Sequence, residues 1–257
     1  MKKLILFIVL PFLGCASVPK ERGQDDRVLV PSGLYSPLFR EPGEQDQPIS
    51  SFYMDRTPVT RERLYVFLEA NESFKKDKIV RRLADAAYLD GWPDGKPQLG
   101  TENWPVTSVS WFVARAYCRE QGGRLPTIAE WEYAANAQDP DNLKKILAWY
   151  AKPGDALDPV ESLRVDRRGL AGMHGVIWEW VEDFSSVLLQ GDSRSSNDTD
   201  GELFCGAGAL NAKRPDEYAT FMRFAFRSSL KASSTVRTLG FRCAYDGARR
   251  VKKDGER

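Results

Sequence analysis

The sequence predicts an α+β domain that is rich in loops, with short strands and two or three helices. Two early segments, VLVPSGLYSPL from residue 28 and ISSFYMDRTPVT from residue 49, alternate apolar and polar residues as short strands do. Three later segments repeat apolar residues at helical spacing. After the third of these segments helical patterning largely ends, and the remaining hundred or so residues have irregular glycine and aspartate spacing, so loops and short strands are expected there.

The three expected helices have recognisable start and stop signals. RERLYVFLEANESF repeats leucine and phenylalanine at helical spacing, and Thr60 before it is a suitable N-cap. FVARAYCREQGG follows the N-cap candidate Ser110 and ends in the glycines at 122–123, which favour termination. LPTIAEWEYAANA contains Thr127 followed three residues later by Glu130, and this spacing predicts a capping box.

Composition sets broad limits on function. The chain has 257 residues, 42% of them hydrophobic, and this content is sufficient for a sizeable core. Its 37 basic and 36 acidic side chains leave no net field that would attract nucleic acid. The densest basic run, KKDKIVRR at residues 75–82, is interrupted by Asp77 and apolar residues, and we interpret it as a helix with a solvated face. The sequence therefore predicts no nucleic-acid partner.

The N-terminus has the pattern of a bacterial lipoprotein signal. Lys2 and Lys3 precede an apolar run at residues 4–13, and FLGC, which ends in Cys15, resembles a lipobox. The run is shorter than the ~20 residues that a membrane-spanning helix needs. Residues 1–14 are therefore predicted to be a signal peptide and Cys15 the lipidated first residue of the mature chain. The alternative is an ordinary secretory signal in which Cys15 is incidental.

The segment after the signal indicates how the protein is anchored. Residues 15–27 are polar and charged without apolar periodicity, which is typical of a flexible tether. Acyl chains on Cys15 would hold the protein at a membrane surface, so we expect the membrane as a partner and the bacterial cell envelope as the location. Ala16, in place of an aspartate after the cysteine, resembles lipoproteins sent to the outer membrane. A single domain is expected at residues 28–246, followed by a charged C-terminal tail at 247–257.

Five blocks within this domain resemble a known family. They are, in order, FYMDRTPVT, WPVTSVSWFVARAYC, GGRLPTIAEWEYAA, GLAGMHGVIWEW and LGFRCA. Together they resemble the sulfatase-modifying-factor domain of formylglycine-generating enzymes, over residues 28–246. The resemblance implies the formylglycine-generating-enzyme fold, a C-type-lectin-like arrangement of short strands and two or three helices among irregular loops, often with structural calcium.

The resemblance implies a candidate calcium site in GVIWEWVEDF, which begins at Gly175. In the family, the glutamate that matches Glu179 holds calcium together with the backbone carbonyls that match Gly175 and Ile177. The family has an asparagine where Val176 stands, so one oxygen is lost from a metal that takes six or more. Glu179 is therefore interpreted as a buried structural carboxylate, either with calcium or without it.

The family's oxidases use two cysteines, five residues apart, which bind one copper ion. Counting back from RSSLKASSTVRTLGFRCA places this pair on Arg214 and Ala219, and counting forward from GAGA places it on Asn211 and Asp216. None of these positions has a cysteine, and copper(I) needs soft ligands such as thiolates. The sequence therefore predicts neither catalytic residues nor a copper site.

The chain also lacks the histidines that would bind iron. Iron-dependent relatives of this fold use three histidines, whereas this chain has only His174. A histidine is usual at this point of the family's motif, so His174 is interpreted as a packed or hydrogen-bonded structural residue. One histidine is also too few for a facial triad of two histidines and a carboxylate. The nearby Trp178 and Trp180 are interpreted as core residues.

The remaining cysteines divide into a pair and a single thiol. Cys118 and Cys243 match two cysteines that are disulfide-bonded in the family, and an envelope compartment permits their oxidation. Cys205 is left over, near the position of the family's active-site groove, and is either a reactive thiol or a small buried cysteine. The acidic segment GDSRSSNDTDGE at 191–202 lacks the closing glutamate of a calcium loop and is interpreted as a solvated insertion.

Two classes of function follow from these observations. The first, which the missing cysteine pair favours, is a non-catalytic binding or assembly module of an envelope machine of the motility or secretion type, with an envelope protein as partner. The second is a metal-dependent oxidoreductase that acts on proteins or small molecules through ligands of another kind, such as Cys205 with a second residue. The two classes differ in whether the purified protein holds a stoichiometric metal ion.

Overall fold

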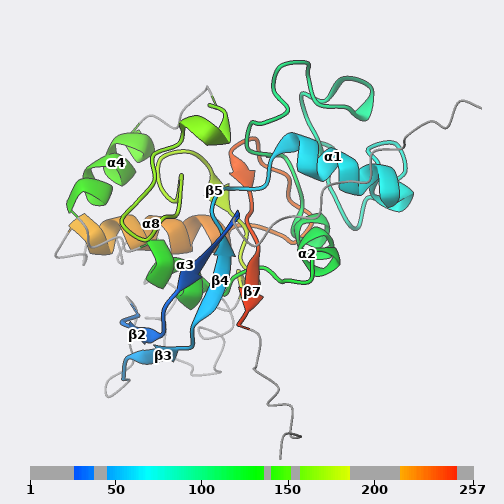
Figure 1. The fold of residues 1–257 in the computed structure, drawn as a ribbon. Coiled ribbons are helices and arrows are strands. Elements are labelled where there is room, and N and C mark those ends of the chain that lie inside the picture. Colours follow the sequence, from blue (N-terminus) through cyan, green and yellow to red (C-terminus); the bar gives the residue numbers. More distant parts are fainter. Residues whose placement is uncertain (1–25, 38–44, 136–139, 152–156, 186–214, 248–257) are drawn as a thin grey trace, which may run out of the picture.

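The computed structural model describes residues 26–37, 45–135, 140–151, 157–185 and 215–247. Figure 1 shows short strands at the centre, with α1 and α2 on one side and α3, α4 and α8 on the other. The strands are β1 Arg27–Val30, β2 Gly33–Tyr35, β3 Gln47–Ile49, β4 Phe52–Asp55, β5 Trp178–Glu179, β6 Leu239–Gly240 and β7 Ala244–Asp246. The helices are α1 Arg61–Ala70, α2 Trp111–Glu120, α3 Ile128–Ala135, α4 Pro140–Ala151 and α8 Pro215–Ser228, with one-turn helices at Glu72–Phe74, Pro93–Gly95 and Val160–Ser162.

The central sheet joins the two ends of the domain. Its order is β1-β4-β7, with antiparallel pairing throughout, so that Met54 lies between Val28 and Ala244. Val28, Val30 and Met54 are buried, whereas Leu29 is 51% exposed, as the alternation of a half-buried strand requires. A second pair, β2 with β3, is antiparallel, and β5 pairs with β6 in parallel.

The three expected helices are confirmed, and their N-caps form as predicted. Thr60 at the start of α1 and Ser110 at the start of α2 each accept a hydrogen bond from the backbone N–H three residues on, at 3.3 Å. Before α3, the Glu130 N–H donates to the Thr127 hydroxyl at 3.2 Å while the Glu130 carboxylate accepts from the Thr127 N–H at 2.8 Å. This is the reciprocal capping box that the spacing indicated.

Two further helices, α4 and α8, correct the expectation that helical patterning ends after α3. In α4 the signal was present, because Pro140 opens the helix and Ile146 lies on its buried face. In α8 an apolar signal was present too, because Ala219, Phe221 and Phe224 are buried on it. The other buried positions, Arg223 and Arg227, are arginines. A search for apolar residues at helical spacing recognises only the apolar part of such a face.

The basic run at residues 75–82 is a series of turns and bends, so the helix predicted for it was wrong. Its side chains and backbone are instead tied into the long loop after α1. The Lys76 ammonium donates to the carbonyl oxygens of Leu89 and Trp92 at 2.9 and 3.3 Å. These hydrogen bonds from Lys76 hold the segment in an irregular conformation, which its charge pattern alone does not predict.

One large hydrophobic core packs the sheet against α1, α2 and α3. The disulfide implied by the family resemblance lies in it: Cys118 of α2 is bonded to Cys243 beside β7, with an S–S distance of 2.00 Å. Both cysteines are 0% exposed. Among the described residues, no helix has the length and apolar character to cross a membrane. The signal peptide, Cys15, Cys205 and the acidic segment 191–202 lie outside the described residues.

Candidate functional site

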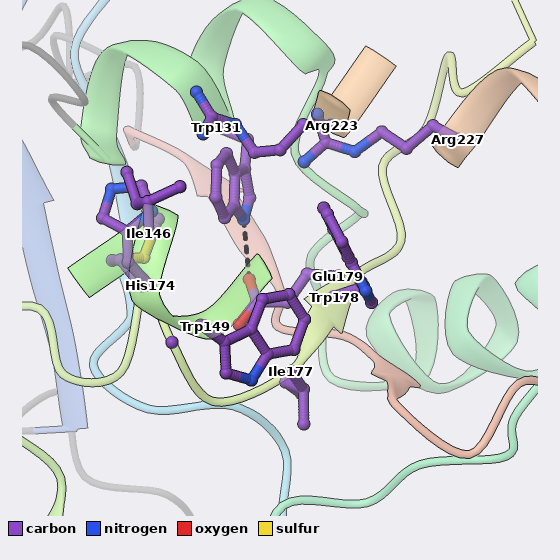
Figure 2. A pocket seen from close by; sticks show the side chains of 11 residues that line it. Trp131, Ile146, Trp149, His174, Ile177, Trp178, Glu179, Arg223 and Arg227 are labelled. Atoms are coloured by element: carbon purple, nitrogen blue, oxygen red, sulfur yellow. Dashed lines mark hydrogen bonds between the residues drawn. The ribbon is translucent and has the colours of Figure 1, made fainter. Parts of the chain in front are cut away.

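A pocket lies between α3, α4, α8 and the segment that leads into β5. It has about 300 Å³ of empty space, part of which is open to solvent. Its walls include Trp131, Trp149 and Trp178, and two arginines of α8, Arg223 and Arg227, reach toward Trp131 (Figure 2). The pocket therefore combines flat apolar walls with buried positive charge.

Glu179, the candidate calcium ligand, forms a buried ion pair with Arg242. The Arg242 Nε lies 3.0 and 2.9 Å from the two carboxylate oxygens, and its Nη2 lies 2.8 Å from Oε1. The Trp131 indole N–H also donates to Oε2 at 2.7 Å (Figure 2). Both charged side chains are 0% exposed, so the interpretation of Glu179 as a buried structural carboxylate agrees with its surroundings.

Arg242 connects this carboxylate to distant parts of the backbone. Its Nη1 donates to the carbonyl oxygens of Asp55 and Arg56 at 3.3 and 3.1 Å, and its Nη2 donates to the Ala171 carbonyl at 2.9 Å. The guanidinium thus holds the end of β4, the loop before β5 and Glu179 in one arrangement. Because the guanidinium and two of its acceptor residues, Asp55 and Ala171, are buried, the arginine is a structural centre of the domain.

The other two predicted calcium ligands lie in the same turn. Gly175 has a φ of +78°, a left-handed conformation that suits glycine, and Ile177 is buried. A calcium ion on Glu179 would lie close to the Arg242 guanidinium, which repels a cation. Within the described part of the chain, no group of three or more His, Cys, Asp and Glu side chains could hold a metal ion. Calcium at this turn therefore stays the untested and less favoured alternative for Glu179.

A second buried ion cluster joins α3 to α8. Glu132 accepts hydrogen bonds from the Nε and Nη2 of Arg223 at 2.8 and 2.6 Å, and from the Nη1 of Arg227 at 3.1 Å. Burial acts to raise the pKa of the Glu132 carboxyl, but Arg223 and then Arg227 outweigh it and hold that pKa below its usual range. Glu132 is therefore ionised at neutral pH and fixes α8 against α3.

His174 lies beside this cluster as a neutral side chain. Its Nε2 is 2.9 Å from the Ala135 carbonyl oxygen, and its ring packs edge-on against Trp131 with centroids 5.7 Å apart. Burial and the nearby Arg223 charge lower the pKa of the imidazole to about 4. These contacts agree with the structural interpretation of His174, because the ring nitrogen that faces Ala135 is already in use as a donor.

Lowering the pH from 7 to 5 is expected to reduce the free energy of unfolding by about 1–2 kcal/mol through His174. In the unfolded chain the imidazole titrates near its ordinary pKa of 6.5, whereas in the folded domain the pKa of about 4 keeps it neutral. Its contribution is thus complete above pH 6.5 and is lost as the pH falls toward 4. His174→Gln removes this titration and keeps an N–H for Ala135. Urea unfolding should show a smaller loss in the variant, and equal losses in both proteins would contradict the assignment.

The tryptophans that flank Glu179 have different surroundings. Trp180 is 0% exposed and its indole N–H donates to the Val109 carbonyl at 2.8 Å, so it is a core residue as predicted. Trp178 is half-buried and lines the pocket, where its ring stacks on Phe226 with centroids 4.5 Å apart and meets Trp149 edge-on at 4.8 Å. The interpretation of Trp178 as a core residue alone was incomplete.

None of the positions that match the family's cysteine pair has a cysteine in this sequence. Ala219 is 0% exposed on α8 and packs in a small apolar cluster with Ile146 of α4. Asp216 lies within α8, but its side chain is outside the described residues, as are Arg214 and Asn211. The two cysteines of the described region are both consumed in the disulfide.

Comparison with known proteins identifies the family. Residues 15–247 match the model of the sulfatase-modifying factor enzyme 1-like domain. The chain belongs to this family. It is 30% identical to a formylglycine-generating enzyme of Streptomyces coelicolor, over 91% of this chain and 92% of that protein. It is also 30% identical to the inactive C-alpha-formylglycine-generating enzyme 2 of Bos taurus, over 57% of this chain and 52% of that protein.

The fold is shared with solved structures of low sequence identity. The crystal structure of CarF is similar with a TM-score of 0.50 and 16% identity, covering 86% of this chain and 98% of that chain. Together with the mixed, loop-rich architecture described above, these comparisons confirm the predicted fold class.

Sequence reasoning missed the arginines that organise the site. Arg223, Arg227 and Arg242 are each 2% exposed or less, although arginine is rarely fully buried without a partner. The signal available in the sequence was the spacing of Ala219, Arg223 and Arg227 at intervals of four residues. Only the fold shows that the partner of Arg223 and Arg227 is Glu132, some ninety residues earlier in the chain, and that the partner of Arg242 is Glu179.

Proposed function

We propose that this protein is a lipid-anchored envelope protein whose formylglycine-generating-enzyme-like domain is a non-catalytic binding or assembly module of an envelope machine. The observation that carries the proposal is the buried, apolar surroundings of Ala219. One of the two counts places a catalytic cysteine there, and in this chain the position is an alanine buried against Ile146 of α4. An apolar contact between two helices offers neither a soft ligand for copper nor space for a substrate thiol.

The titratable groups in and beside the pocket also favour a scaffold. Glu132 is neutralised by arginines, Glu179 is neutralised by Arg242, and His174 is hydrogen-bonded to a backbone carbonyl. A general base needs a lone pair that is free to accept a proton and a pKa near the working pH. A nucleophile needs such a base beside it. Each of these side chains is instead committed to holding elements of the fold together.

The family gives a precedent for this role. One relative is named as an inactive enzyme, so the fold is retained in at least one protein that is described as lacking the activity. The lipid anchor is inferred from the lipobox-like sequence FLGC, and the outer-membrane location is inferred from Ala16 after the cysteine. An anchored domain without catalytic cysteines is suited to presenting a fixed surface to a protein partner in the envelope.

One experiment with two readouts tests this proposal. The full chain and its Cys15→Ser variant are expressed in a diderm bacterium, and membranes are washed with high salt and separated on a density gradient. We expect the parent in the outer-membrane fraction and the variant in the soluble fraction, because acylation requires the Cys15 thiol. Cys205→Ser is the matched control, since it removes another thiol and should leave the protein on the membrane.

The second readout is the metal content of the same purified proteins. After loading with copper(I) or iron(II) and removal of excess metal, we expect well below one ion per chain. A stoichiometric ion that is lost in Cys205→Ser would instead favour the oxidoreductase alternative. A Cys15→Ser variant that still sediments with salt-washed membranes would contradict the lipid anchor.

A further inference from the structure

The pocket contains an arginine whose hydrogen-bonding capacity is largely unused. Arg227 is 2% exposed and lines the pocket. Within the described residues, its guanidinium makes one side-chain hydrogen bond, from Nη1 to Oε1 of Glu132 at 3.1 Å. A guanidinium has five N–H donors, and its charge is not lost at any physiological pH. Most of its donors are therefore left for a group that enters the pocket.

The nearest acids are already matched to other partners. Glu132 receives both prongs of the Arg223 fork at 2.8 and 2.6 Å, so Arg227 shares an oxygen that already has a closer donor. Glu179 is paired with Arg242. Asp183 accepts a hydrogen bond from the Ile128 N–H at 2.7 Å at the start of α3. Glu132 thus hydrogen-bonds to two guanidinium groups, and the only other acid that the Arg227 charge is shown to reach among the described residues is Asp183, without a hydrogen bond between them. A buried charge is costly unless it is paired.

The walls around Arg227 restrict the kind of group that fits. Its guanidinium carbon lies 4.8 Å from the centroid of the Trp131 ring, and Trp178 forms another apolar face of the pocket (Figure 2). The empty space of about 300 Å³ includes open solvent and the enclosed part is small, so one short side chain or chain end fits better than an extended ligand. A planar anion between aromatic faces satisfies both the charge and the shape.

We propose that this pocket binds a single carboxylate presented by a protein partner, with Arg227 as the residue that recognises it and the tryptophans as its apolar walls. The proposal rests on the proposed function, because it names the chemistry by which a binding module would hold its partner. A carboxylate accepts two parallel hydrogen bonds from a guanidinium, and this geometry uses the donors that Glu132 leaves free. The carboxylate comes either from an acidic side chain or from a C-terminus.

Titration with capped dipeptides tests the proposal on the full chain. The probes are acetyl-Gly-Glu-amide, its uncharged match acetyl-Gly-Gln-amide, and acetyl-Gly-Gly with a free C-terminal carboxylate. Binding is followed by the NMR shifts of the indole N–H groups of Trp131 and Trp178. We expect saturable shifts with one or both acids and none with the glutamine peptide. The stronger of the two acidic probes identifies the side chain or the C-terminus as the source.

Arg227→Gln is expected to weaken binding of the acidic probe at least about tenfold, because hydrogen bonds to a charged group are lost. Arg237→Gln is the matched control, since Arg237 is exposed, pairs with Asp90 and does not line the pocket, and it should bind as the parent does. If Arg227→Gln does not fold, the comparison of glutamate and glutamine peptides on the parent still decides. Equal shifts with both peptides, no saturation with any probe, or full affinity in a folded Arg227→Gln protein would each overturn the proposal. Membrane anchoring and metal content are independent of these results.

Discussion

Glu179→Ala is expected to lower the free energy of unfolding by about 3–5 kcal/mol, because it leaves the Arg242 guanidinium buried without its counter-charge. Both side chains of the pair are 0% exposed, so water cannot replace the lost carboxylate. The indole N–H of Trp131 loses its acceptor as well. For a domain of this size the melting temperature should fall by roughly 6–20 °C, measured by circular dichroism or calorimetry.

Glu182→Ala is the matched control for this prediction. Glu182 lies three residues further along the same segment and also pairs with an arginine, Arg115, at 2.7 Å, but both side chains are about 30% exposed. Solvent screens such a pair, so its loss should cost no more than about 1 kcal/mol. Equal destabilisation by the two substitutions, or an unchanged melting temperature in Glu179→Ala, would show that burial of the pair with Arg242 does not stabilise the fold.

The same measurement addresses calcium. If the ion pair with Arg242 is the whole role of Glu179, the parent should melt at the same temperature in calcium and in a chelator. Calcium bound through Glu179 and the carbonyls of Gly175 and Ile177 would instead raise the melting temperature of the parent by mass action, and Glu179→Ala would abolish that increase. We expect no calcium dependence, because the carboxylate oxygens already accept hydrogen bonds from Arg242 and Trp131.

Local signals in the sequence predicted local structure well. The N-caps at Thr60, Ser110 and Thr127 follow from interactions within three residues, and all three helices begin at them. The strands β1 and β4 follow from alternation within four residues. The disulfide between Cys118 and Cys243 was implied by five ordered blocks that resemble the family, and spacing alone could not assign it.

The candidate site was harder to predict because it is built from contacts between distant residues. Glu179 is recognised from its segment, but its partner Arg242 lies 63 residues later, and Glu132 is separated from Arg223 by 91 residues. A buried arginine resembles an exposed one in sequence, so the sequence predicts a loop where the structure has α8. The fold was therefore accessible from local and family patterns, whereas the electrostatics of the pocket required the three-dimensional arrangement.

Replacing both cysteines of the disulfide, Cys118→Ala with Cys243→Ala, should destabilise the domain by up to about 5 kcal/mol. The bond spans 125 residues, and closing so long a loop removes much of the entropy of the unfolded chain in the chain-entropy model. The cross-link also joins α2 to the residue before β7. Strand β7 in turn pairs with β4 in the central sheet. Chemical denaturation of the double variant and of the parent under non-reducing conditions measures the difference.

Cys205→Ser is the control for this last prediction, because Cys205 is expected to carry a free thiol that contributes no cross-link. Its melting temperature should equal that of the parent, and a reducing agent should lower the stability of the parent and of Cys205→Ser alike. The reducing agent should have no effect on the double variant, which has no disulfide to lose. A non-reducing peptide map should recover Cys118 joined to Cys243. Recovery of Cys205 joined to either of them would contradict both the pairing and the assignment of Cys205 as the unpaired cysteine.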